Sequence, residues 1–216
     1  MMMMMTMMTM MSKIRIPNKI YDIVYADPPW TYKDKMKPSM SVVKQCKTQT
    51  IEWLCGLPVK KLAADDCCLF LWTTSPMLPL GIQVMEAWGF RYKTVAFCWS
   101  KLTKNGYDAY NPGQWTMGNV ELCLLGTKGK PNKWRENKGA KQLVRVPRTA
   151  HSRKPNEVRT RIVDMLGDRS RIELFARERY CGWDAWGDEL PDEVSDCSCD
   201  RGSQCSDCTS QELIVS

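Results

Sequence analysis

The stretch YDIVYADPPW, residues 21–30, decides how the rest of the chain is interpreted. Its first six residues form a short apolar run that predicts a buried strand, and an acid, two prolines and a tryptophan follow directly. Open α/β sheets place their chemistry in loops at the carboxyl ends of strands. Each proline fixes its own φ at about −65° and restricts the residue before it, so this loop is expected to be rigid. Rigid carbonyl and carboxylate acceptors beside a flat ring suit an exocyclic amino group on a nucleobase.

A plainer interpretation of this loop stands beside the functional one. Asp-Pro-Pro is also an ordinary turn, and a tryptophan that follows it is often a packed anchor. The position directly after a strand, together with the other segments of the chain, favours the functional interpretation.

Alternating apolar strands and amphipathic helices predict the fold class. Thr48 or Thr50 is expected to cap the first helix, and Gly89 and Gly167 to follow the ends of the other two. This alternation predicts an α/β domain with a mostly parallel, doubly wound sheet and helices on both faces. Strands are expected at residues 21–26, 67–73, 94–100, 120–126 and 171–176, and helices at 48–54, 80–88 and 155–166.

Composition predicts one compact domain between two tails. Of the 216 residues, 1–12 form a Met-rich tail, 13–190 the expected catalytic domain, and 191–216 an acidic, Cys-rich tail that is expected to be disordered. No apolar run approaches the roughly 20 residues of a membrane span. Eleven cysteines without an export signal predict reduced thiols in a cytoplasmic compartment.

Charge is unevenly distributed along the chain. Residues 128–179 contain sixteen Lys or Arg against six Asp or Glu, whereas residues 184–216 contain nine acids and one Arg. A concentrated basic band is the expected footprint of a phosphate backbone. Its alternative is a solvated surface with scattered ion pairs. Residues 126–139 combine basic residues with Pro, Asn and Gly, which favours a loop.

The last cysteines are a candidate metal site. Four thiolates within twelve residues can satisfy tetrahedral zinc. Because the intervening residues are Asp, Ser and Gly, a disordered Cys-rich tail is the alternative. The four residues are Cys197, Cys199, Cys205 and Cys208.

Several segments in order resemble one known family. The chain is similar to the DPPW-type adenine-N6 methyltransferases, which include the eukaryotic messenger-RNA adenosine methyltransferase and compact phage and bacterial DNA members. The resemblance implies a Rossmann-like fold of permuted order, with S-adenosylmethionine as methyl donor. The matching segments are YADPPW at 25–30, LFLWTT at 69–74, CWSK at 98–101, ELCLLGTKG at 121–129, HSRKPNEV at 151–158, IELFAR at 172–177 and GWDAWGDE at 182–189.

The resemblance assigns roles by position. It makes Asp27, Pro28, Pro29 and Trp30 the catalytic loop. Relatives commonly carry Asn at the position of Asp188, which changes the expected hydrogen bonding to the cofactor. The residues expected to bind the cofactor are Asp27, Lys128, Glu173, Phe175, Arg177, Asp188 and Glu189.

A second set is expected to meet the substrate. Trp72 has core packing as its alternative role, and His151 an ordinary loop position. A pair of Glu173 and Arg177 at the strand ends could equally be a surface ion pair of little energetic weight. The residues expected to bind substrate are Trp30, Tyr32, Trp72, Arg148, His151, Arg153 and Lys154.

The expected reaction needs neither a metal nor a covalent intermediate. Asp27 and the Pro28 carbonyl would each accept one hydrogen of adenine N6, Trp30 would stack on the base, and the methyl would pass in line. The compact chain favours DNA over RNA, with target specificity expected from residues 31–47 and 128–150. The alternatives are an RNA adenosine-N6 methyltransferase, a cytosine-N4 methyltransferase, and an inactive nucleic-acid-binding partner subunit.

Overall fold

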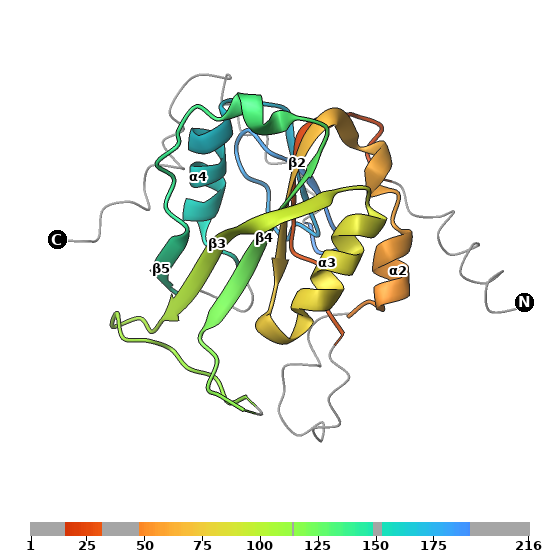
Figure 1. Cartoon of the computed structure of the whole chain (residues 1–216). Helices are drawn as coiled ribbons and strands as arrows, with labels where there is room; N and C mark the ends of the chain where they lie inside the picture. The colour runs from red at the N-terminus through yellow and green to blue at the C-terminus, as the bar shows by residue number, and fades with distance from the viewer. Residues whose placement is uncertain (1–15, 32–47, 114, 149–152, 191–216) are drawn as a thin grey trace, which may run out of the picture.

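The computed structural model describes residues 16–31, 48–113, 115–148 and 153–190. A seven-stranded sheet in the order β5-β3-β4-β2-β1-β6-β7 runs through the centre of this region (Figure 1). The strands are β1 (Tyr21–Ala26), β2 (Ala63–Thr73), β3 (Arg91–Leu102), β4 (Val120–Lys128), β5 (Leu143–Pro147), β6 (Arg171–Leu174) and β7 (Asp184–Trp186). The α-helices are α2 (Ile51–Gly56), α3 (Leu78–Ala87) and α4 (Asn156–Leu166), with 3-10 turns at Val59–Lys61, Ser75–Met77 and Pro131–Trp134.

One strand of the described sheet runs against the other six. β1 pairs in parallel with β2 and β6, β3 with β5, and β6 with β7, whereas β4 is antiparallel to both β2 and β3. A hairpin connection joins β3 to β4, and only antiparallel neighbours can be joined that way. The expected mostly parallel α/β sheet is confirmed. The carboxyl ends of β1, β2, β3, β5, β6 and β7 therefore lie at one edge, called the carboxyl edge, and β4 begins there.

Side chains of β1 alternate between two cores. Val24 and Ala26 pack with α2 and α3 on one face, whereas Ile23 and Tyr25 pack with α4 on the other. The alternation follows from the two-residue repeat of a strand. Burial on both faces explains why β1 is a nearly continuous apolar run. Figure 1 shows α2 and α3 side by side, with α4 on the other side of the sheet, as the doubly wound prediction requires.

Several boundaries differ from the sequence-based expectation. Thr50 caps α2, its hydroxyl accepting from the Trp53 backbone N at 3.2 Å. The sequence predicted neither β5 nor β7, and β5 lies inside residues 128–150, which were expected to be a loop that contributes to target specificity. β6 ends at Leu174 because Phe175 adopts a left-handed backbone, with φ of 61°. In the described part of the chain, no helix is both long and apolar enough to cross a membrane.

Candidate active site at the carboxyl edge of the sheet

The Asp-Pro-Pro-Trp loop is held from both sides. Its Asp27 backbone N donates to the Leu174 carbonyl of β6 at 3.5 Å, and the Pro29 carbonyl accepts from the Gln49 backbone N at 2.9 Å. Within the loop, the Trp30 backbone N donates to the Pro28 carbonyl at 2.9 Å. The loop therefore leaves β1 as a braced turn, and its acceptors are fixed at the carboxyl edge.

Trp30 anchors this loop. Its side chain is 7% exposed, and its indole Nε1 donates to the Trp72 carbonyl at 3.0 Å. It packs within the core that α2 and α3 cover. The expectation that Trp30 stacks on a base is not supported here, because little of its ring face is free. The alternative of a packed anchor describes it.

Trp72 is a core residue rather than part of a base pocket. It is fully buried, its Nε1 donates to the Tyr25 hydroxyl at 2.6 Å, and its ring meets Trp99 edge-on at 6.4 Å between centroids. Its place in the expected substrate set is therefore wrong. Its carbonyl and its indole instead link Trp30 to Tyr25 beneath the catalytic loop.

Four charged groups alternate beside the loop. Lys154 Nζ lies 2.6 Å from Asp27 Oδ2 and 3.2 Å from Glu121 Oε2, and Lys101 Nζ lies 2.5 Å from Glu121 Oε1. These residues, Asp27, Lys154, Glu121 and Lys101, are called the charge chain. Lys154 is 6% exposed and its ammonium also lies over the Trp72 ring at 5.7 Å. The charge chain contains two carboxylates and two ammonium groups, so it carries no net charge. This pairing offsets the free-energy cost of burying the charges.

The titration of these groups follows from their neighbours. Burial raises the pKa of the Asp27 carboxyl above its ordinary value, although Lys154 acts in the opposite direction. Burial also disfavours charge on Glu121, but Lys154 and Lys101 outweigh it and hold the pKa of Glu121 below its usual range. Burial opposes charge on Lys154 too, yet Asp27 and Glu121 together raise its pKa. Lys154 and Glu121 are therefore firmly ionised, and Asp27 is the more readily protonated of the two acids in the charge chain.

The expected phosphate contacts are only partly at the surface. Lys154 is buried in the charge chain rather than exposed as a phosphate contact would be, and its expected role as a substrate-binding cation stays a prediction. Arg153 pairs with Glu178, and Arg148 is exposed just beyond β5. Tyr32 and His151, also expected in the substrate set, lie outside the described residues.

Part of the expected cofactor set gathers next to Asp27. Phe175 stands at the tip of β6, and its ring meets Trp186 of β7 edge-on at 5.5 Å between centroids. Arg177 Nε lies 3.3 Å from Glu189 Oε2, and its charge contributes to lowering the pKa of Asp27. Asp188, in the same segment, is exposed. Left-handed backbone at a non-glycine residue such as Phe175 is uncommon and often marks a functional site.

Glu173, also expected in the cofactor set, is held by an arginine of α4. It is 6% exposed, and Arg159 of α4 takes both of its oxygens, Nε to Oε2 at 2.8 Å and Nη2 to Oε1 at 2.6 Å. Its expected role as a cofactor ligand stays a prediction, whereas the alternative of a surface pair with Arg177 is wrong, because Glu173 is buried and pairs with Arg159. The sequence did carry a signal for Arg159: it lies on the same face of α4 as Ile162 and Leu166, where a charge needs a partner.

Lys128 lies at the opposite edge of the sheet. Its Nζ donates to the Ala63 carbonyl at the start of β2 at 2.9 Å and lies 3.9 Å from Asp65 Oδ1. β4 is antiparallel to β2 and β3, so its carboxyl end, where Lys128 lies, is remote from Asp27. The expectation that Lys128 contacts the cofactor is therefore wrong. Glu121, at the beginning of the same strand, is one of the site residues that the sequence did not predict.

The site described above lies within residues 21–189, which match the MT-A70 family model. The chain belongs to the MT-A70 family of methyltransferases. Within that family it is 38% identical over 195 residues to the type II methyltransferase M.MunI of a Mycoplasma species, covering 82% of this chain and 81% of the relative. The resemblance drawn from the ordered motifs is thereby confirmed.

Longer MT-A70 relatives match over the same region. The human N(6)-adenine-specific methyltransferase METTL4 is 28% identical over 185 residues, which are 80% of this chain and 38% of the relative. The human N(6)-adenosine-methyltransferase catalytic subunit METTL3 is 26% identical over 173 residues, 79% of this chain and 28% of the relative. The chain thus spans well under half the length of these two proteins.

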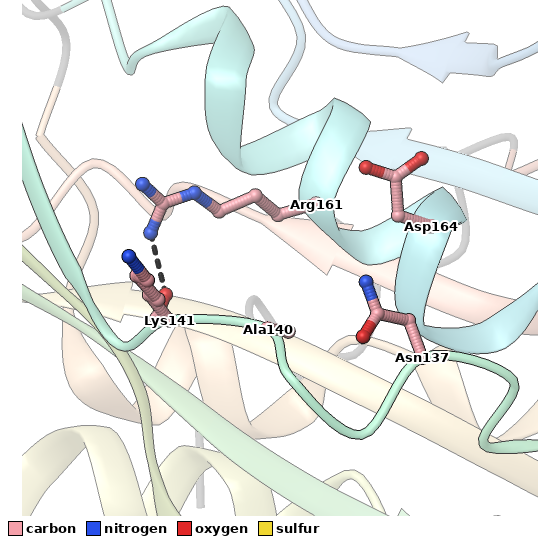
Figure 2. Close-up of a pocket in the computed structure, with 5 residues that line it drawn as sticks. All are labelled: Asn137, Ala140, Lys141, Arg161 and Asp164. Atoms are coloured by element: carbon pink, nitrogen blue, oxygen red, sulfur yellow. Dashed lines mark hydrogen bonds between the residues drawn. The ribbon is translucent and has the colours of Figure 1, made fainter.

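A surface hollow elsewhere in this MT-A70 chain is distinct from the site. Figure 2 shows it between α4 and the segment that leads into β5, lined by Asn137, Ala140, Lys141, Arg161 and Asp164. Its volume is about 120 Å³, whereas pockets for small molecules hold roughly 300–1,000 Å³. It is too small for a nucleoside cofactor and contains none of the charge chain. The expected zinc ligands Cys197, Cys199, Cys205 and Cys208 lie outside the described residues, so that hypothesis stays a prediction.

Proposed function

We propose that this chain transfers a methyl group from S-adenosylmethionine to the exocyclic N6 amine of adenine in DNA. The observation that carries the proposal is the braced Asp27 carboxylate, held by Lys154 beside the Pro28 carbonyl at the carboxyl edge. Residues 13–190 would form the catalytic domain, and the family match at residues 21–189 falls within it.

Two acceptors in this loop suit the two hydrogens of the amine. Lys154 engages Asp27 Oδ2, so Oδ1 is the Asp27 oxygen for a substrate N–H. The Pro28 carbonyl accepts from the Trp30 backbone N and, like any carbonyl oxygen, has a second lone pair. With both hydrogens held, the nitrogen lone pair would be turned out of conjugation with the ring and toward the methyl donor. Positioning by fixed dipoles then supplies the rate enhancement.

Asp27 also suits the proton that leaves. Methylation of a neutral amine produces a cationic nitrogen that must lose one proton. Burial raises the pKa of Asp27, so this carboxylate is a better proton acceptor than an exposed one. Lys154 favours its ionised form before the reaction, which is the stronger hydrogen-bond acceptor.

The chemistry of the neighbouring residues fits the cofactor. S-adenosylmethionine supplies an electrophilic methyl on a sulfonium, and it also carries an ammonium, a carboxylate and ribose hydroxyls. Arg177 would meet the carboxylate, whereas Asp188 and Glu189 would accept from the hydroxyls or the ammonium. Phe175 would pack against the apolar part of the cofactor from the tip of β6. No metal ligand is needed in this scheme.

Similarity favours DNA as the substrate of this site. The type II methyltransferase M.MunI shares 38% identity and matches this chain over four fifths of both proteins, whereas the N(6)-adenosine-methyltransferase METTL3 shares 26% and only 28% of its length.

One experiment tests the proposal directly. The purified protein is incubated with isotope-labelled S-adenosylmethionine and either duplex DNA or single-stranded RNA, and the methylated nucleoside is identified by mass spectrometry. We expect N6-methyladenine from DNA. Methylation confined to RNA would overturn the choice of DNA, and N4-methylcytosine would overturn the choice of base. Failure to bind the cofactor in calorimetry would identify an inactive partner subunit instead.

A further inference from the structure

Most of the exposed large apolar side chains gather on one connection. Residues 103–119 join β3 to β4 and are called the β3–β4 hairpin. Four of the six exposed large hydrophobics in the described ranges lie on it: Tyr107 at 74%, Tyr110 at 51%, Trp115 at 96% and Met117 at 62%. Exposed apolar side chains that cluster, rather than scatter singly, mark an interaction surface.

Backbone hydrogen bonds hold the described residues of the hairpin, which are 103–113 and 115–119. Asn111 and Gly118 exchange two backbone hydrogen bonds, of 2.8 and 2.9 Å, and the Lys101 backbone N donates to the Asn119 carbonyl at 2.8 Å. Ala109 is tied back to the carbonyl of Lys101 at 2.8 Å. The described residues of the hairpin are thus tied together by two isolated β-bridges, Leu102 with Asp108 and Asn111 with Gly118, and the connection projects beyond the ends of β3 and β4 (Figure 1).

Both ends of the hairpin are adjacent to residues of the candidate active site. Lys101, two residues before it, and Glu121, two residues after it, pair with each other in the charge chain that reaches Asp27 through Lys154. Because β3 ends and β4 begins at the carboxyl edge, the exposed aromatics stand on the same edge as the catalytic loop.

Charge at the foot of the hairpin is basic. Lys104 is exposed, and Arg148 is exposed beside it, with its backbone N donating to the Leu102 carbonyl at 2.9 Å. Arg145 reaches across to Asp108 of the hairpin, with Nη2 and Oδ1 3.2 Å apart, and is half exposed. Asp108 offsets the charge of Arg145, so Lys104 and Arg148 provide the attraction for a phosphate backbone.

We propose that the β3–β4 hairpin holds the strand that carries the target adenine, with bases stacked on Tyr107, Tyr110 and Trp115. This inference rests on the proposed function. Residues 103–119 contain no Leu, Ile, Val or Phe, and their aromatics alternate with Asn, Gly and Thr. Such rings, beside cations, are the usual platform for unpaired bases. A target base that leaves the stack exposes its neighbours, and the hairpin would cover them.

Substitution of the most exposed ring tests the inference. Trp115→Ala removes a side chain that is 96% exposed, so the fold should persist, and Tyr107→Ala is a second probe. The matched control is Ile20→Ala, which removes a 56% exposed side chain just before β1, at the opposite edge. Fluorescence anisotropy measures the Kd for a labelled single-stranded DNA of mixed sequence, and calorimetry measures the Kd for S-adenosylmethionine.

We expect each hairpin variant to raise the Kd for DNA by at least about fivefold. Binding of S-adenosylmethionine should not change, and Ile20→Ala should behave as the parent protein. Unchanged DNA affinity in both hairpin variants would overturn the inference. A parent dimer that Trp115→Ala converts to a monomer, at unchanged DNA affinity, would overturn it in favour of a protein interface. If the variants lose DNA binding but the parent methylates no nucleic acid, the hairpin inference stands and the proposed function fails.

Discussion

Replacement of Lys154 by methionine tests the charge chain most directly. The ammonium lies between two carboxylates, 2.6 Å from Asp27 Oδ2 and 3.2 Å from Glu121 Oε2, and is almost completely buried. Methionine keeps most of the volume and removes the charge. Lys154 is the foremost influence that lowers the pKa of Asp27, so its loss leaves burial and the repulsion from Glu121 opposed only by Arg177.

The size of the effect follows from the contact. A buried hydrogen bond to a charged group contributes about 1.5–3 kcal/mol, and one pKa unit corresponds to about 1.4 kcal/mol. The pKa of Asp27 should therefore rise further by roughly one to two units. The ionised carboxylate is the stronger acceptor for a substrate N–H and the only form that can take up the departing proton, so activity is lost as the pH falls through this pKa. A higher pKa moves that loss to higher pH.

The assay is kcat as a function of pH, at saturating cofactor and DNA. In Lys154→Met we expect the acidic limb of the profile to shift upward by roughly one to two pH units. Lys154→Arg, which keeps the charge, should shift it much less. Lys133→Met is a further control, because Lys133 forms an exposed pair with Asp66, 2.7 Å apart, on another part of the surface. An unshifted limb in folded Lys154→Met would refute the proposed role of the charge chain.

Three further predictions concern residues in or near the candidate active site. Asp27→Ala should abolish methyl transfer yet leave S-adenosylmethionine binding largely intact; calorimetry and a transfer assay check this, and full activity would remove the proposed role. Arg159→Met leaves the buried Glu173 without its partner and should lower the free energy of unfolding by about 3–5 kcal/mol, which corresponds to roughly 6–20 °C in Tm. A double variant with Glu173→Met should recover most of this loss, and equal Tm values for the single and double variants would contradict the prediction. Gly187→Ala would place a Cβ 2.2 Å from the Ala176 carbonyl oxygen, so the segment between Arg177 and Glu189 must shift; we expect weaker cofactor binding by calorimetry, with Gly118→Ala, where a Cβ meets nothing within 4 Å, as the unchanged reference.

The sequence predicted the elements that are strongly periodic or continuously apolar. β1 begins and ends as predicted, because a strand covered on both faces needs an unbroken apolar run. The ordered motifs also predicted the family and the braced Asp27 loop. β7 has three residues, too few to show a period, and β5 lies within a basic stretch that resembles a loop.

Residues brought together from distant parts of the chain were the harder part. Lys154 was expected at the surface because its neighbours are basic and polar, yet it is the buried partner of Asp27, 127 residues away. Glu173 was expected to bind cofactor, yet Arg159 takes both of its oxygens. Such pairings depend on which faces of helices and strands meet in the folded protein. A local sequence pattern can show that a buried charge needs a partner, but it cannot predict which residue that partner is.

From its own pattern the sequence determined an α/β sheet with a rigid acidic loop at a strand end, because burial and proline geometry act locally. Only the tertiary structure showed that β4 is antiparallel to its neighbours. This direction places Lys128 at the end of the sheet remote from the site and Glu121 at the site. Strand direction is set by pairing and by packing across the whole sheet. The same alternation of side chains fits either direction, so the sequence pattern could not distinguish them.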